Sequence, residues 1–494
     1  MKTPTYFLLL GLLLIKAAVA IVMIITYGVH LSPDEAQYWT WSRVLDWGYY
    51  SKPPAIAWQI GLTTSLFGDT ELGVRIGAVL IAFLLPLAVY HLALSVGLKQ
   101  KSCFWAAIAM AFSPLGIYLT FAATTDGGAI LCLTLALSAI VKQPNYPLAG
   151  FWIFLGALYK WIAFLFWPLV LLFSLFFPEM RRKNLIWGML FSFLALFPSI
   201  YWNMSHEWAT FKHVGSAVGQ SSGGNFLDFL GAQVGLISPI FFCLLLIGYR
   251  YLWKSANHSL TLCALFPTFV LAYLSLALFK KVQPNWAAYL YPPAMVLIGW
   301  VGYEKLQSGR VWLPIGTALS ILCTSGAIVI PAIQSHNLFS KFHIPYKVNP
   351  FRHSMGWDQL QPILEASGYR SDKDFLFGDK YQTASLLSFY GPEKKQAYFF
   401  NISETRKNQF SYWPSMQERE LGKTGFFVVL EHAKADSLSW YENHYLERLS
   451  PYFEEVEWVG SYPLFLAYGE AVKYGVVFKC RNYQGEGPID PEKY

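Results

Sequence analysis

Charged residues are scarce in this chain. Only 14% of its 494 residues are Asp, Glu, Lys or Arg, whereas 55% are hydrophobic, and soluble domains carry roughly a quarter charged residues. This composition excludes a disordered chain, a coiled coil and a collagen-like repeat. The shortage is uneven, because residues 1–333 hold 19 basic and 10 acidic side chains while residues 334–494 hold 18 and 20. The first part is therefore apolar and basic, and the last part resembles an ordinary soluble protein.

Two kinds of motif are missing as well. Five of the six cysteines lie inside apolar runs, and only Cys480 lies in the last third of the chain. There is no Cys-x-x-Cys pair and no Cys/His spacing, so neither a disulfide framework nor a structural zinc site is supported. The chain also lacks a glycine-rich phosphate-binding loop, and nothing in it indicates nucleotide hydrolysis.

Apolar runs long enough to span a bilayer, which takes about 20 residues, recur throughout the first part. They predict a polytopic α-helical membrane protein with about eleven spans, within a range of roughly 9–13. The segment 147–178 is either one long tilted helix or two spans. The expected spans lie near residues 6–28, 72–97, 103–121, 127–141, 147–159, 162–178, 184–203, 229–249, 256–279, 286–303 and 311–333.

Basic residues predict the orientation, since Lys and Arg in short loops favour the cytoplasm. With the N-terminus inside and 147–178 split in two, four basic clusters fall on the cytoplasmic side and residues after 335 fall outside. We therefore predict a transmembrane domain over 1–335 and a soluble periplasmic α/β domain over 336–494. The clusters are Lys99 with Lys101, Arg181 to Lys183, Arg250 with Lys254, and Lys305 with Arg310.

The first apolar run raises the question of a signal peptide. Ala18-Val19-Ala20 fits a cleavage site, but the run continues to Ile25 and other spans follow, so an uncleaved first helix is the better interpretation. Lys16 within this helix either snorkels to the interface or faces the helix bundle.

The first outer loop, residues 29–71, is rich in polar and aromatic side chains. Asp34 and Glu35 come directly after the first span, and aromatic residues follow as far as Lys52-Pro53-Pro54. Ser32 or Asp34 can cap a helix that starts near Glu35, where the helix dipole would keep Asp34 ionised. The alternative is that the acids only cap the helix and the aromatics form an interfacial belt.

Other charged residues also fall on the outer side. Asp126 lies at the junction of the third and fourth spans, Lys160 at the turn within 147–178, and Lys280-Lys281 at the outer end of 256–279. Lysines on this side oppose the positive-inside bias. They are explained if they face a phosphate, or else they snorkel to lipid headgroups.

Outward carboxylates and lysines together suggest transfer from a lipid-phosphate donor. Cations stabilise the negative charge that develops on a phosphate leaving group, and a carboxylate removes the proton of the acceptor. One carboxylate with nearby cations suits inverting displacement at a sugar's anomeric carbon. It does not suit the paired acids of glycoside hydrolases.

At these residues the sequence resembles GT-C glycosyltransferases of the protein O-mannosyltransferase type. Within that group it looks most like the bacterial transferases that add aminoarabinose or galacturonic acid to lipid A or its core. The motifs that carry the resemblance are Asp34-Glu35, Lys52-Pro53-Pro54, Thr124-Thr125-Asp126, Tyr201-Trp202-Asn203, Glu207-Trp208-Ala209, Gly231 to Pro239, Gln283-Pro284-Asn285-Trp286 and Gly378 to Gln382.

The resemblance implies roles for individual residues. Asp34 matches the acid that acts as base or organises the reaction centre, with Glu35 beside it, and Asp126 matches the second acid. Lys52 matches the lysine that holds the lipid phosphate. Ala36-Gln37 stand where the aminoarabinose branch has an Arg, which puts the donor and acceptor in doubt. Further candidates are Lys160, Lys280, Lys281 and Arg43 for the donor phosphate, and Tyr49, Tyr50, Asn285 and Trp286 for lining the substrate.

Metal use stays open at this stage. Asp34 and Asp126 could bind a hard divalent cation through oxygen, and members of the resembled group differ in whether they use one. We expect no obligatory cofactor.

The C-terminal part reads as a small α/β domain. Apolar runs at 374–377 and 425–430 predict strands, 383–390 predicts a helix, and 462–478 predicts a hairpin around Gly469-Glu470. This domain covers the active-site mouth, contacts the acceptor or is purely structural. Its aromatic residues Phe399, Phe400, Phe410, Tyr412 and Trp413 either touch sugar or lipid or pack in the core.

Together these features predict an inner-membrane glycosyltransferase, a hexosyl- or pentosyltransferase with a periplasmic active site. The donor would be a polyprenyl-phosphate sugar, and the acceptor lipid A, lipopolysaccharide core or another envelope glycan. No nucleic acid or obligate protein partner is expected. The alternatives are a protein O-mannosyltransferase and a flippase for lipid-linked sugars, although no internal repeat favours a transporter. The outer loop with Ser221-Ser222-Gly223-Gly224 is either a lid or a flexible connector.

Overall fold

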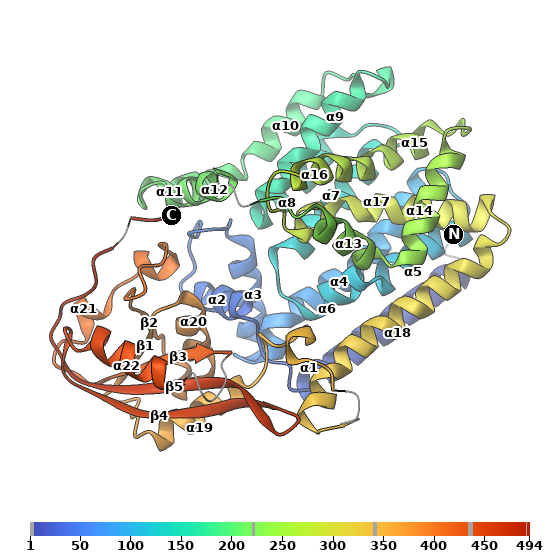
Figure 1. Cartoon of the computed structure of the whole chain (residues 1–494). Coiled ribbons are helices and arrows are strands. Elements are labelled where there is room, and N and C mark those ends of the chain that lie inside the picture. Colours follow the sequence, from blue (N-terminus) through green and yellow to red (C-terminus); the bar gives the residue numbers. More distant parts are fainter. Residues whose placement is uncertain (1–3, 220–222, 339–342, 433–437, 491) are drawn as a thin grey trace. The chain divides into compact units, whose positions relative to one another are not determined.

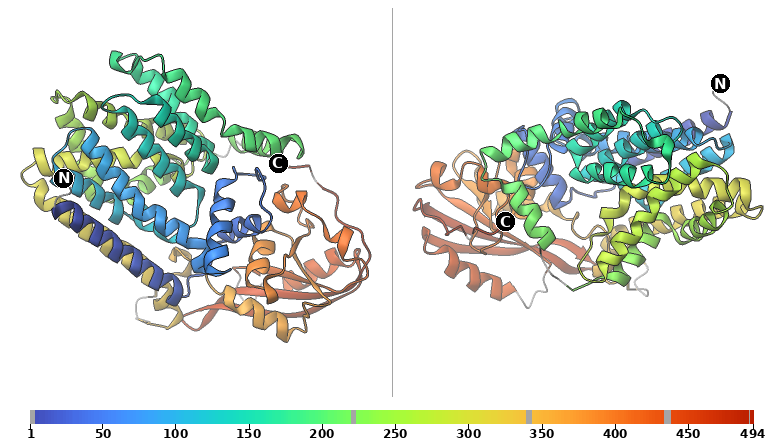
Figure 2. Two further views of the ribbon diagram at one scale, coloured as in Figure 1. Left: turned by 180° about the vertical axis from the view of Figure 1, so that it is seen from behind. Right: turned by 90° about the horizontal axis from the view of Figure 1, so that it is seen from above.

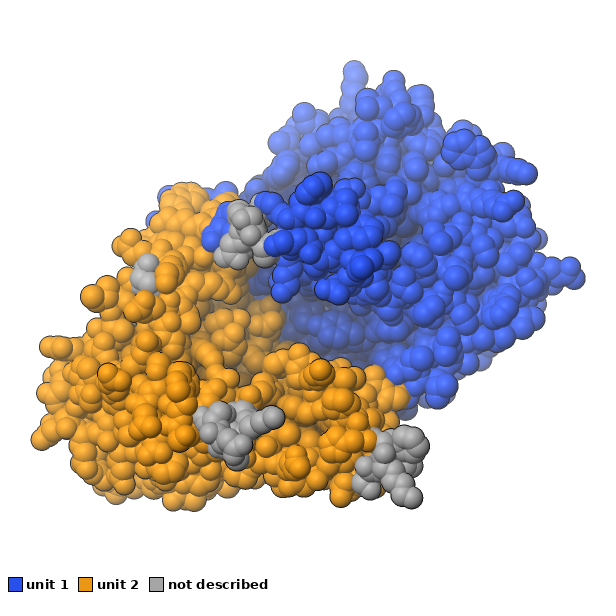
Figure 3. All heavy atoms as spheres, viewed as in Figure 1, with its two compact units in different colours: residues 1–26, 52–205, 215–325 blue, residues 27–51, 206–214, 326–494 orange. Residues whose placement is uncertain are grey.

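The computed structural model describes residues 4–219, 223–338, 343–432, 438–490 and 492–494 (Figure 1). Ser221 and Ser222, in the predicted lid or connector, lie outside the described residues. The chain forms two compact units, coloured separately in Figure 3. Unit 1 holds residues 1–26, 52–205 and 215–325, and unit 2 holds residues 27–51, 206–214 and 326–494.

Among its described residues, unit 1 contains helices and no β-strand. Its α-helices, with the connecting helix α12 and the start of α18, are α1 (Pro4–Thr26), α3 (Ala55–Phe67), α4 (Glu71–Ser95), α5 (Gln100–Phe112), α6 (Pro114–Phe121), α7 (Thr125–Ile140), α8 (Tyr146–Tyr159), α9 (Phe166–Ser174), α10 (Leu185–Phe193), α11 (Leu196–Met204), α12 (Ala209–Gly219), α13 (Phe226–Ile237), α14 (Pro239–Leu252), α15 (His258–Leu265), α16 (Val270–Ala277), α17 (Tyr291–Trp300) and α18 (Gly309–Ser335). Short 3-10 or π segments link them: η1 (Trp161–Leu165), η2 (Pro178–Met180), η3 (Phe266–Phe269), η4 (Pro284–Leu290) and η5 (Val301–Lys305).

Several of these helices can span a membrane. Among the described residues, five are long and apolar enough, and the count rises to seven if each of two bent pairs is one span. The bends, 55° between α5 and α6 and 95° between α13 and α14, each precede a proline at the start of the second helix, Pro114 and Pro239. Proline lacks the N–H that would continue the first helix. A multi-span helical protein is confirmed, and the count of eleven stays a prediction.

The segment 147–178 is divided, as the charge pattern required. Helix α8 ends at Tyr159, Lys160 is extended with φ −157° and ψ 126°, and η1 begins at Trp161. Two separate helical segments therefore replace one long helix.

Small residues allow the helices of unit 1 to pack closely. A Cβ on Gly150 of α8 would lie 2.3 Å from the Gly188 carbonyl oxygen of α10, and a Cβ on Gly188 would lie 2.3 Å from the Tyr146 carbonyl oxygen. Such contacts are a usual way for helices to associate in lipid. Lys16 also faces this bundle, because its Nζ donates to the Gly116 carbonyl oxygen at 3.0 Å.

Unit 2 is built around a five-stranded sheet of order β2-β1-β3-β5-β4. Strand β1 pairs in parallel with β2 and β3, and β5 pairs antiparallel with β3 and β4. Figures 1 and 2 show β4 and β5 as a long antiparallel pair. The strands are β1 (Phe375–Gly378), β2 (Tyr398–Phe399), β3 (Gly425–Glu431), β4 (Phe453–Ala467) and β5 (Glu470–Tyr483). The predicted strands and the hairpin at Gly469 are present, and the hairpin is longer than predicted.

Helices and short turns surround the sheet. The helical elements of unit 2 besides the ends of α12 and α18 are α2 (Pro33–Arg43), η6 (Tyr346–Val348), η7 (Trp357–Gln359), α19 (Leu360–Ala366), α20 (Tyr381–Tyr390), η8 (Pro392–Lys394), η9 (Gln409–Tyr412), α21 (Met416–Arg419) and α22 (Leu438–Leu449). Alternate strand residues face opposite sides. Phe427 packs against Tyr445 of α22, with ring centroids 5.1 Å apart, and Phe426 packs against Tyr369 after α19 at 5.5 Å. Both faces of the sheet are thus covered, as in other α/β domains.

Residues 29–51 of the first outer loop are part of unit 2, whereas residues 52–71 belong to the helical unit. Ser32 caps α2 in a capping box, accepting from the Glu35 amide at 3.3 Å while Glu35 Oε2 accepts from the Ser32 amide at 2.9 Å. Helix α2 packs against α20, where the Trp39 and Phe389 rings meet edge to face at 4.9 Å. The predicted helix near Glu35 is therefore present and anchored. Unit 2 thus includes residues ahead of the predicted domain boundary at 335.

The cap predicts a local effect of Ser32→Ala. Loss of an N-cap hydroxyl costs about 1 kcal/mol, so we expect amide hydrogen exchange across α2 to become about fivefold faster. Exchange of the full-length protein followed by mass spectrometry measures this. Ser42→Ala is the control, because the Ser42 hydroxyl donates only to the Trp39 carbonyl oxygen one turn earlier. Equal exchange in both variants would contradict the capping role.

Candidate active site

Asp126 is the centre of a polar cluster in unit 1. It lies in the first turn of α7, where the positive end of the helix dipole stabilises a carboxylate. Its Oδ1 accepts from Lys160 Nζ at 2.7 Å, and its Oδ2 accepts from Asn285 Nδ2 at 3.0 Å. The structure thus brings together three predicted site residues that are far apart in the sequence.

Close packing between α7 and α8 positions this cluster. A Cβ on Gly128 would lie 2.6 Å from the Tyr159 ring, so glycine is needed for the two helices to approach. The Tyr159 hydroxyl donates to Gln59 Oε1 at 2.8 Å, which fixes the end of α8. Lys160 follows directly in the extended break and reaches Asp126.

The ion pair is partly shielded from solvent. The Lys160 and Asp126 side chains are only 16% and 13% exposed, so their attraction is screened less than that of a surface pair. Both Asp126 oxygens already accept a hydrogen bond. This arrangement suits Asp126 to holding the Lys160 side chain in place, while the remaining ammonium protons can serve an anionic ligand.

The other predicted residues of unit 1 differ in their burial and position in the chain. Lys280 is half-buried and Lys281 exposed, just after α16. Lys52 precedes α3 and is half-buried. Trp286, in η4, packs partly buried against the hydrophobic core of the unit.

Asp34 lies in unit 2, exposed in the first turn of α2. Burial raises the pKa of Tyr381 in α20 to about 12, the Asp34 carboxylate raises that pKa too, and the Arg406 guanidinium opposes this. Both charged groups therefore act on one phenol. Sequence reasoning missed Arg406 altogether. It included Tyr381 only in the weakly matching stretch Gly378 to Gln382.

Three further predicted site residues make contacts within unit 2. Glu35 is 2% exposed and occupied by the cap of α2. Tyr49 is fully buried, stacks on Trp41 at 4.7 Å, and donates to the Trp41 carbonyl oxygen at 3.1 Å. The Arg43 guanidinium lies 5.6 Å from the centroid of the Trp39 ring. The geometry thus assigns Glu35 to the helix cap and Tyr49 to the loop core.

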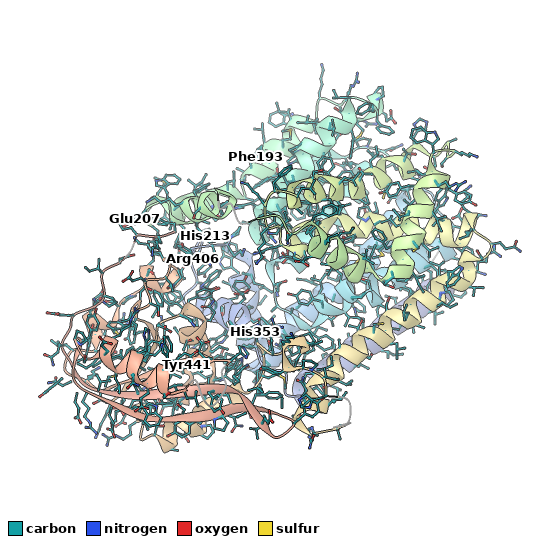
Figure 4. The ribbon with its side chains drawn as sticks, in the orientation of Figure 1. Phe193, Glu207, His213, His353, Arg406 and Tyr441 are labelled. Atoms are coloured by element: carbon teal, nitrogen blue, oxygen red, sulfur yellow. The ribbon has the colours of Figure 1, made fainter. Side chains whose placement is uncertain are left out.

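Arg406 belongs to a polar patch drawn from three parts of unit 2 (Figure 4). Its Nη1 lies 2.8 Å from His213 Nδ1, and the His213 ring packs against Tyr50 with centroids 5.0 Å apart. The Tyr50 amide donates to Gln409 Oε1 at 2.7 Å, and Thr210 Oγ1 donates to the Tyr49 carbonyl oxygen at 3.1 Å. These bonds fix the first outer loop and residues 206–214 around an exposed guanidinium.

Metal binding was predicted only as an option for Asp34 and Asp126. These two acids lie in different units, and no group of three His, Cys, Asp or Glu suited to a metal occurs in the described part of the chain. At Asp126, a cation would have to displace the Lys160 ammonium from Oδ1.

Comparison with known proteins agrees with the resemblance. Residues 51–202 match the family model described as dolichyl-phosphate-mannose-protein mannosyltransferase. The chain is 29% identical over 306 residues to the lipid A galacturonosyltransferase RgtD of Rhizobium johnstonii, which covers 58% of this chain and 64% of the relative. The chain thus spans a little under two thirds of that relative's length.

The fold is similar to that of a solved structure. ArnT from Cupriavidus metallidurans bound to undecaprenyl phosphate aligns with a TM-score of 0.66 and 14% identity, covering 98% of this chain and 99% of that one. Its apo structure aligns with a TM-score of 0.62 and 15% identity, over 97% and 99%. Nearly the whole chain therefore shares the ArnT fold, and the predicted resemblance is confirmed.

The close contact at Gly128 predicts that Gly128→Ala is destabilising. An added methyl group there must displace the Tyr159 ring or separate α7 from α8, which costs about 1–3 kcal/mol. Thermal unfolding of the purified protein should show a lower midpoint. Gly231→Ala in α13 is the matched control, because a Cβ at that position meets nothing within 4 Å. A midpoint unchanged by Gly128→Ala would contradict the packing argument.

Proposed function

We propose that this protein is a membrane glycosyltransferase that moves a sugar from a polyprenyl-phosphate donor to lipid A or a related lipopolysaccharide acceptor. The likeness to the lipid A galacturonosyltransferase carries the proposal. The ArnT fold, seen there with undecaprenyl phosphate, supports the donor class. The apolar helices support a bacterial inner-membrane location, and the charge pattern supports a periplasmic site.

The reaction is a displacement at the anomeric carbon of the donor sugar. The acceptor oxygen forms the new bond to this carbon as the bond to the phosphate oxygen breaks, and polyprenyl phosphate leaves. Where the acceptor is a hydroxyl group, its proton passes to the Asp34 carboxylate. Where the acceptor atom is a phosphate oxygen, no proton is released and Asp34 orients the reactants.

The leaving phosphate requires positive charge. Lys160, held by Asp126 and partly shielded from solvent, stabilises this charge more strongly than a fully exposed lysine would. Lys52 is the second candidate for the donor phosphate, with Lys280 and Lys281 as further ones. Asn285 donates to Asp126 and completes the support of Lys160.

A protein O-mannosyltransferase is the second candidate, since the matching family model describes such enzymes. Its acceptor would be a Ser or Thr hydroxyl on a polypeptide. The two candidates differ in acceptor and share the proposed chemistry.

Asp34→Asn should reduce sugar transfer about a hundredfold or more, because a positioned general base contributes roughly that factor. The assay uses protein in lipid nanodiscs, radiolabelled polyprenyl-phosphate sugars including galacturonic acid, and lipid A or a membrane extract as acceptor. A polypeptide rich in Ser and Thr, offered separately, tests the mannosyltransferase alternative.

Asp46→Asn is the matched control for Asp34. It lies in the same loop, and its Oδ1 accepts a local bond from the Trp47 amide at 2.7 Å. Transfer should be close to that of the unmodified protein. Transfer undiminished in Asp34→Asn would refute the assigned role.

Arg406→Ala should raise the KM for one of the two substrates about tenfold to a hundredfold, since the variant loses charge-assisted hydrogen bonds to an anionic group. Varying donor and acceptor separately shows which substrate Arg406 contacts. Arg370→Ala is the control, being an exposed arginine in the loop before β1. If Arg406→Ala has the same KM for the donor and the same KM for the acceptor as the unmodified protein, Arg406 is not part of the site.

A further inference from the structure

A cleft of about 150 Å³ opens beside the edge strand β2 of unit 2, among residues that the proposed chemistry does not use. Strand β2, η9, α21 and residues 488–490 form its walls. The sequence offered its aromatic residues either for ligand contact or for the core. Phe399, Phe400, Phe410 and Trp413 line the cleft together with Tyr398, and Phe400 is also part of the core of unit 2.

The aromatic wall is fixed before any ligand binds. The Trp413 ring meets the buried Phe410 ring edge to face, with centroids 5.3 Å apart and planes at 78°. The Tyr398 hydroxyl donates to Glu420 Oε1 at 2.7 Å, which locks the Tyr398 ring. The cleft therefore presents rigid, half-exposed aromatic surface at little cost in side-chain entropy.

The lining of the cleft also carries neutral hydrogen-bonding groups. Gln396 and Gln417 place exposed amides at the cleft. The Asn401 side chain is held by Thr405, whose amide and hydroxyl donate to its Oδ1 at 2.8 and 2.9 Å. The charge of Asp490 is balanced by Lys407 Nζ at 3.3 Å. The lining is thus polar with little net charge.

The combination of aromatic rings and neutral amides in this cleft favours some classes of ligand over others. A phosphate needs cations, and no Lys or Arg occurs among the described residues that line the cleft. An acyl chain would leave the two glutamine amides without partners. An added peptide strand would need a long open edge, and β2 has only two residues.

The geometry points to a saccharide subsite, in which one pyranose residue packs its C–H face on the aromatic wall and offers its hydroxyls to the amides. That the sugar belongs to the acceptor rests on the proposed function. The subsite would then select acceptors that carry an extended glycan over lipid phosphates with no further sugar.

Binding can be measured without catalysis. Full-length protein in nanodiscs is titrated calorimetrically with the deacylated core oligosaccharide of lipopolysaccharide. Trp413→Ala should weaken binding about tenfold through loss of aromatic contact area, and Gln417→Ala should weaken it several-fold. Trp440→Ala is the matched control, because Trp440 is 57% exposed on α22 and outside the cleft. It should bind as the unmodified protein does.

In the transfer assay, Trp413→Ala should raise the KM for a glycan-bearing acceptor and leave kcat and the KM for the donor unchanged. Oligosaccharide binding that is unaffected in both Trp413→Ala and Gln417→Ala overturns the subsite. Displacement of the oligosaccharide by a Ser/Thr-rich peptide overturns it in favour of a peptide site. Failure of transfer with every donor, with Trp413-dependent binding retained, refutes the proposed function and leaves the subsite standing.

Discussion

The polar site of unit 1 depends on the ion pair between Asp126 and Lys160. A carboxylate and an ammonium group placed among apolar helices are costly when either stands alone, and pairing reduces that cost. The pair requires an extended residue between α8 and η1, and glycine where α7 meets the Tyr159 ring. Asn285 then occupies the second carboxylate oxygen. This one ion pair thereby accounts for the break after α8, for the glycine at position 128 and for Asn285 at the start of η4.

In unit 2, the corresponding constraint is the stabilisation of a short helix that carries an exposed acid. Helix α2 has only 11 residues, and isolated helices of that length are marginal in water. The capping box and the packing of Trp39 on α20 supply the missing stability. Asp34, Tyr381 and Arg406 are brought together by this anchoring, although 372 residues separate Asp34 from Arg406 in the sequence.

The sequence predicted those features that local patterns encode. Apolar runs predicted α1 and α4 to within a few residues, and Gly469 predicted the turn of the β4–β5 hairpin. Lys160 was predicted as a site residue because a lysine outside the predicted cytoplasmic loops is unusual. The bends at Ser113 and Ser238 were missed, since apolar composition continues through them. The burial of Tyr49 and Glu35 was not predicted, because burial cannot be read from residue type, and Arg406 was missed because its neighbours come from distant segments.

The composition of unit 2 also has a consequence for biosynthesis. Residues 27–51 leave the ribosome long before residues 326–494, which supply the sheet and α20. Until those later residues are translated, α2 has no partner for Trp39, and the Asp34 carboxylate has no Tyr381 beside it. Residues 27–51 therefore wait for their packing partners while the helices of unit 1 are being made. Completion of unit 2 is thus a late step in the maturation of this protein.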